Sequence, residues 1–122
     1  MSEQKLKVIV KSISLMNDIM SVTSNRKRFL VKYVILVNRI QEKCMDIYEC
    51  LMDANRTDVN TNKALRSELQ TKAVTACDKL SCYIELSMNQ NLISTGLVEN
   101  LQKKIDDIKY MTIAWRSKDK NR

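Results

Sequence analysis

The sequence contains no histidine and no proline, and Gly96 is the only glycine among its 122 residues. Without histidine, the chain lacks the commonest general base and metal ligand of enzymes. A single glycine leaves no glycine-rich loop that could hold a phosphate group. The glycine- and proline-containing turns that usually separate the strands of a sheet are missing as well. These absences argue against an enzyme and favour an all-helical protein.

Long apolar runs are also missing. No segment approaches the roughly 20 consecutive apolar residues that a transmembrane helix needs. Near the N-terminus, Lys5, Lys7 and Lys11 interrupt the apolar residues that would have to form the core of a signal peptide. We therefore expect a cytoplasmic protein that does not contact a membrane.

In place of these features, the sequence has apolar residues at helical spacing. Leu6, Ile9, Ile13, Met16 and Met20 recur every three or four residues, which is the period of one helix face. Several such segments joined by short polar breaks predict one all-α domain, an antiparallel up-down-up-down four-helix bundle. The helices are expected at residues 4–22, 27–54, 61–90 and 95–116, followed by a charged C-terminal tail at residues 117–122.

Capping residues and apolar faces complete this prediction. Ser24 or Asn25 is expected to cap the second helix, and Ser94 the fourth. Trp115 is either a core anchor near the end of the bundle or an interface residue. The expected inner faces comprise Tyr33, Leu36, Ile40, Cys44, Ile47 and Leu51 in the second helix, Leu65, Leu69, Ala73, Ala76, Leu80, Tyr83 and Ser87 in the third, and Leu97, Leu101, Ile108, Thr112 and Trp115 in the fourth.

The four cysteines are Cys44, Cys50, Cys77 and Cys82. On a helix, the first two point about 120° apart and the last two about 140° apart, so neither pair presents two ligands to one metal ion. We expect reduced cysteines that act as small apolar residues, with no metal and no other cofactor.

Positive charge is the strongest functional signal, because the chain has a net charge of +7. No carboxylate lies between Arg26 and Gln41, and on the expected second helix Arg28, Lys32, Arg39 and Lys43 fall within about 60° of one another. Such a surface attracts phosphate backbones, although it could equally be a solvated face that keeps the protein soluble. The predicted contact residues are Arg26, Lys27, Arg28, Lys32, Arg39 and Lys43, with Lys103, Lys104, Arg116 and Lys118 as a second set.

The expected second helix also carries apolar residues outside its main stripe. Val34, Met45 and Met52 lie about 100° or more from the centre of that stripe, and Val31 and Ile35 flank the basic residues. A four-helix monomer buries one face of each helix, so the surplus surface predicts a homo-oligomer; the alternative is a thick monomer core.

Several segments resemble one family of small bacterial four-helix-bundle proteins. The run Arg39-Ile40-Gln41, followed by Asp46-Ile47-Tyr48-Glu49 and Ala54-Asn55, is similar to the second helix of that family. Asp78-Lys79-Leu80 resembles its third helix, and Asp106-Asp107-Ile108 with Trp115 its last. The family includes the accessory variability determinant of diversity-generating retroelements and the protein encoded in intervening sequences of ribosomal RNA.

The resemblance implies a barrel-shaped homopentamer, encoded by a bacterium or a phage, that binds the retroelement's reverse transcriptase and its RNA or DNA. In that system the accessory protein is required for mutagenic retrohoming, while the polymerase performs the reaction. One alternative is an interaction protein of the intervening-sequence type with no reverse-transcriptase role. Another is a small enzyme or metal protein that uses the cysteines.

Overall fold

The computed structural model describes the backbone of residues 3–121 and the side chains of residues 7–121, and over this range it contains helices and no strand. An all-helical protein with four α-helices was predicted, and that prediction is confirmed. The elements are α1 (Glu3–Thr23), the single-turn 3₁₀ helix η1 (Val31–Tyr33), α2 (Val34–Arg56), α3 (Lys63–Asn89) and α4 (Thr95–Lys120).

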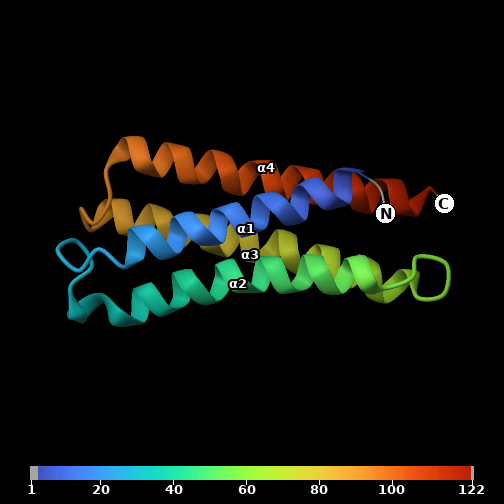
Figure 1. The fold of residues 1–122 in the computed structure, drawn as a ribbon, viewed down its shortest axis with the longest axis horizontal. Coiled ribbons are helices and arrows are strands. Elements are labelled where there is room, and N and C mark those ends of the chain that lie inside the picture. The colour runs from blue at the N-terminus through green and yellow to red at the C-terminus, as the bar shows by residue number, and fades with distance from the viewer. Residues whose placement is uncertain (1–2, 122) are drawn as a thin grey trace.

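The four α-helices surround one apolar core. Helices α1 and α3 each pack against α2 and α4, and within the described range neither diagonal pair makes close backbone contact. The beginning of α1 and the end of α4 lie at one end of the elongated molecule, and the α1–α2 and α3–α4 connections lie at the other (Figure 1). None of the helices in residues 3–121 combines the length and apolar character needed to cross a membrane.

Heptad spacing defines the buried face of three helices, with steps of four and three residues in alternation. This is the spacing expected where helices pack along their length. The buried residues at this spacing are Ile40, Cys44, Ile47, Leu51 and Ala54 in α2, Arg66, Gln70, Ala73, Cys77, Leu80, Ile84 and Ser87 in α3, and Val98, Leu101, Ile105, Ile108, Thr112, Trp115 and Asp119 in α4; Ala76 of α3 is buried in addition.

The predicted inner face of α1 is partly wrong. Ile13 and Met20 are 40% and 36% exposed, whereas Leu15 and Ile19 are fully buried. The side chain of Leu6 lies outside the described residues. Because apolar residues occur on two sides of α1, their spacing alone could not distinguish the side that packs against α2 and α4.

The start of the second helix differs from the prediction, since α2 begins at Val34 and not at residue 27. Asn25 forms a turn: its backbone carbonyl accepts from the Phe29 amide at 2.9 Å, and its side chain accepts from the Lys27 amide at 3.1 Å. The backbone of Leu30 is extended, so a helix cannot run through it, and the side chain of Phe29 just before it is buried. Neither Ser24 nor Asn25 caps α2, whereas Ser94 does cap α4 by accepting from the Leu97 amide.

The predicted tail is wrong for residues 117–120. Helix α4 continues to Lys120, and Asp119 is 3% exposed. A buried ion pair between Asp119 and Arg66 of α3 holds this last turn in place. Residue 122 of the predicted tail lies outside the described residues.

Candidate functional site

Four predicted contact residues lie together at the connection between α1 and α2. Arg26, Lys27, Arg28 and Lys32 are all exposed, and none of them forms an ion pair with another described residue. Phe29 anchors the connection by inserting into the core. The four cations are therefore held at one end of the molecule, on a segment that is not α-helical.

Arg39 and Lys43 lie farther along, in α2, where carboxylates accompany them. Arg39 Nη1 is 3.5 Å from a carboxylate oxygen of Glu42. Lys43 is only 18% exposed, and its Nζ lies 3.3 Å from Asp46 and 3.7 Å from Glu42. The single basic stripe predicted along the second helix is therefore divided in the structure. One part is the cluster before α2, whose cations form no ion pair with a described residue, and the other is Arg39 and Lys43 within α2, which carboxylates partly neutralise.

The second predicted set lies on α4. Lys104 pairs with Asp18 of α1, and Arg116 Nη1 donates a hydrogen bond to the Thr71 hydroxyl at 2.8 Å. Lys103 and Lys118 are exposed. At 1.5 Å per residue, Lys103 and Lys118 are about 22 Å apart along the helix. Lys118 lies two residues before the end of α4, and α4 ends on the side of the molecule opposite the α1–α2 connection (Figure 1). These four residues do not form one surface with the α1–α2 connection.

Acidic residues are missing from the end of the molecule that carries the cationic cluster. Residues 19–41 and residues 86–98, which include the two connections at this end, contain no aspartate or glutamate (Figure 1). Within these segments no carboxylate offsets the charge of Arg26, Lys27, Arg28 and Lys32, and the resulting potential favours the approach of anionic groups. This acid-free end is the candidate site for nucleic acid or an anionic partner.

A second candidate surface is apolar and is shared by α1 and α2. On α1, Val10, Ile13 and Met20 are exposed and lie within about 80° of one another. On α2, Met45 is 40% exposed, one turn beyond Gln41, whose amide donates a hydrogen bond to Thr23 of α1.

The surplus apolar residues that were predicted for the second helix are thus exposed in two places: Met45 lies on the surface shared with α1, and Val31, Val34 and Ile35 lie at the acid-free end. Met52 is an exception, because it packs against the core.

The cysteine thiols do not assemble into a site. Cys44, Cys50, Cys77 and Cys82 are free, and the side chains of residues 7–121 form no cluster suited to a metal ion. Burial raises the pKa of the Cys44 thiol to about 12. Burial, and to a lesser extent the negative charge of Asp78, raises the pKa of the Cys77 thiol to about 12. At neutral pH both thiols are protonated apolar groups of the core.

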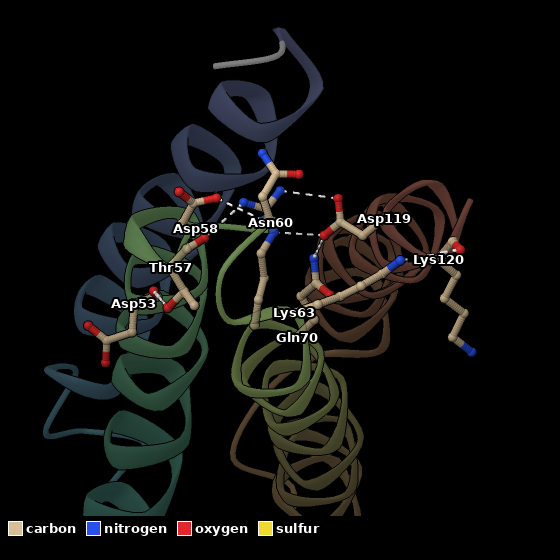
Figure 2. A network of polar contacts seen from close by, with 9 residues as sticks. Asp53, Thr57, Asp58, Asn60, Lys63, Gln70, Asp119 and Lys120 are labelled. Atoms are coloured by element: carbon tan, nitrogen blue, oxygen red, sulfur yellow. Dashed lines mark hydrogen bonds and ion pairs between the residues drawn. The ribbon is translucent and has the colours of Figure 1, made fainter. Parts of the chain in front are cut away.

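At the opposite end, α3 and α4 are joined by a buried ion pair that was not predicted from the sequence. Arg66 Nε and Nη2 donate to the two carboxylate oxygens of Asp119 at 2.7 and 3.1 Å. The Gln70 amide also donates to Asp119, and Arg66 Nη1 donates to the Thr57 carbonyl just after α2. Figure 2 shows Gln70 and Asp119 pointing toward one another across the helix ends.

Trp115 completes this cluster, because the Arg66 guanidinium lies 5.1 Å from the centre of its ring. Trp115 is 2% exposed, so it is a core residue of the monomer. The signal that could have identified Arg66 and Asp119 is the heptad spacing, which places both in the buried stripes of their helices. Apolar spacing alone selected Leu65, which is 41% exposed.

Comparison with known proteins gives no match. No family model, curated protein or solved structure matches this chain. The resemblance to the retroelement accessory family stays a prediction, and the fold and the two surfaces are the physical grounds for assigning a function.

Proposed function

We propose that this protein is a non-catalytic accessory protein of a diversity-generating retroelement. In this proposal an antiparallel up-down-up-down bundle forms a homo-oligomer, by the resemblance a pentamer, in the bacterial cytoplasm. The oligomer binds the reverse transcriptase and its template RNA or cDNA during mutagenic retrohoming.

The acid-free end carries the proposal. Arg26, Lys27, Arg28 and Lys32 are exposed and are not neutralised by ion pairs, so phosphate groups can approach them without displacing a carboxylate. Each phosphate contact releases condensed counterions, and RNA affinity should therefore fall steeply as salt rises. The exposed apolar residues of α1 and α2 support contacts between copies of the chain.

Charge reversal tests the proposal. In the variant Arg28→Glu/Lys32→Glu/Arg39→Glu, we expect the affinity for a structured RNA to fall by about a hundredfold or more, measured by fluorescence anisotropy at low salt. Binding to the reverse transcriptase encoded beside the gene is measured with the same variant by co-purification.

The matched control is Arg56→Glu/Lys79→Glu/Lys120→Glu, which changes the net charge equally at exposed positions outside the acid-free end. If the control weakens RNA binding as much as the test variant does, the affinity reflects overall charge and not this surface. If both variants bind RNA and the polymerase as the wild type does, the proposed function is wrong.

A further inference from the structure

Four exposed aliphatic residues accompany the cations at the acid-free end. Leu30 and Val34 are about half exposed, at 49% and 51%, and Val31 and Ile35 are 81% and 74% exposed. Phe29 takes the buried position in this segment, which leaves its aliphatic neighbours in solvent. Adjacent apolar side chains that remain exposed on a monomer commonly mark a binding surface.

Three of them, Leu30, Val31 and Val34, border a hollow of about 520 Å³ between the end of α1 and the beginning of α2. A flat or convex surface could not fill such a hollow, but side chains that project from a partner could. The lining consists of Thr23, Ser24, Arg26, Phe29, Leu30, Val31, Val34, Val37 and Gln41.

The charge around the hollow identifies the kind of partner. The connection between α1 and α2 carries four cations that form no ion pair with a described residue, and residues 86–98 at the same end contain no charged residue. A second copy that presented the same end would bring like charges together, which disfavours it. An occupant that carries carboxylates would instead pair with Arg26, which lines the hollow, and with Lys27, Arg28 and Lys32 of the same connection.

We propose that this hollow binds a short acidic segment of a partner protein that carries large apolar side chains. The apolar side chains fill the space beside Val31 and Val34, and the carboxylates pair with the surrounding cations. A phosphate backbone would satisfy the cations but would leave the apolar lining in water. The inference deepens the proposed function and rests on it, because it states the chemistry by which this end holds a protein partner.

Peptide display on the full chain tests the inference. The probe is a library of random 16-residue peptides, selected against the wild type. We expect the enriched peptides to carry a net negative charge and large apolar residues. Their affinity should fall by about tenfold or more in Val31→Ser/Val34→Ser, because two aliphatic contacts are lost.

The control is Leu65→Ser/Tyr110→Ser, which removes exposed apolar side chains away from the hollow and should leave peptide affinity unchanged. Circular dichroism should show that both variants keep their helical content. The affinity for a structured RNA should be equal in the wild type and both variants, since no cation is altered.

Three results would overturn the inference. The first is a selection that enriches neutral or basic peptides, or that enriches no peptide at all. The second is binding to phosphatidylglycerol vesicles that Val31→Ser/Val34→Ser abolishes, which would identify a lipid surface as the occupant. The third is a loss of RNA affinity in that variant, which would assign the hollow to nucleic acid. The proposed function fails separately, if the charge-reversal triple leaves RNA binding and polymerase binding intact.

Discussion

Arg66 and Asp119 place a positive and a negative charge inside the helical core, with side chains only 4% and 5% exposed. Removing two charges from water is costly, and their attraction offsets that cost only when the geometry is good and the remaining polar atoms are bonded. Here the pair is bidentate, and Gln70 and the Thr57 carbonyl supply further hydrogen bonds. The cluster therefore sets how the ends of α2, α3 and α4 meet.

Removing one partner of this ion pair should lower the free energy of unfolding more than replacing both partners. Asp119→Ala leaves the Arg66 guanidinium buried without its carboxylate, and we expect the free energy of unfolding to fall by about 3–5 kcal/mol. The double variant Arg66→Met/Asp119→Leu should lie within about 1–2 kcal/mol of the wild type, because no charge stays buried. Urea denaturation followed by circular dichroism measures both.

The exposed pair between Lys72 and Glu68 is the control, and Lys72→Ala should change stability by less than about 0.5 kcal/mol. A cost for Asp119→Ala no larger than that of Lys72→Ala would contradict the assigned role of the buried pair.

The buried thiols of Cys44 and Cys77 should be unreactive in the folded protein. Their pKa values are raised to about 12, so at pH 8 the thiolate, which is the reactive form, is scarcely populated. Cys82 is exposed and should react first with Ellman's reagent. We expect one fast thiol in native protein and four in urea; fast native labelling of Cys44 or Cys77, located by mass spectrometry, would show that the core opens readily.

Helix α3 ends in a local motif that positions the connection to α4. Asn91 has a positive φ of 61°, the Leu92 amide donates to the Ser87 carbonyl, and the Asn91 amide donates to the Met88 carbonyl. This hydrogen-bond pattern is the Schellman motif, in which a left-handed residue closes the helix. Leu92 and Ile93 then enter the core, so that α4 can begin at Thr95.

Substitution at Asn91 should report the left-handed conformation directly. Asn91→Val should lower the free energy of unfolding by roughly 1–2 kcal/mol, because a β-branched side chain clashes with its own backbone at positive φ. Asn91→Gly should leave stability unchanged or raise it slightly. Thermal or urea unfolding distinguishes the two; equal stability of the Val and Gly variants would mean that the turn adopts another conformation in solution.

Over the whole molecule, the two candidate surfaces adjoin at Thr23 and Gln41 but differ in chemistry. The acid-free end is cationic with an apolar hollow, whereas the surface shared by α1 and α2 presents Ile13, Met20 and Met45. Apolar side chains along two adjacent helices suit contacts between copies of the chain, because such contacts resemble the core packing of a bundle. The proposed oligomer uses this surface and leaves the cationic end free.

Light scattering after size-exclusion chromatography should therefore give a mass of several protomers, five if the family resemblance holds. Ile13→Glu/Met45→Glu should reduce the mass to one protomer while helical content is kept, since it introduces charge on the apolar surface. Leu65→Glu/Tyr110→Glu, on exposed residues of α3 and α4, is the control. A wild-type monomer at all concentrations would exclude the proposed oligomer.

Much of this architecture could be predicted from local sequence signals. The spacing of Ile40, Cys44, Ile47 and Leu51 identified the buried face of α2, and the Ser94 cap marked the beginning of α4. Both are properties of a single helix, because they depend on residues within a few turns of one another. The exposure of Arg26, Lys27, Arg28 and Lys32 was anticipated for a similar reason, since unpaired cations are rarely buried.

Tertiary packing decided the rest. Whether Ile13 or Leu15 faces the core depends on where α2 and α4 lie, and insertion of Phe29 delays the start of α2 and creates the hollow. Arg66 and Asp119 can be buried only because they neutralise each other, and they are 53 residues apart in the chain. By itself the sequence determined the helices and the excess positive charge, since both follow from local composition and period. The distant contacts determined which polar groups are buried and which apolar groups stay exposed, because burial depends on what a neighbouring helix offers.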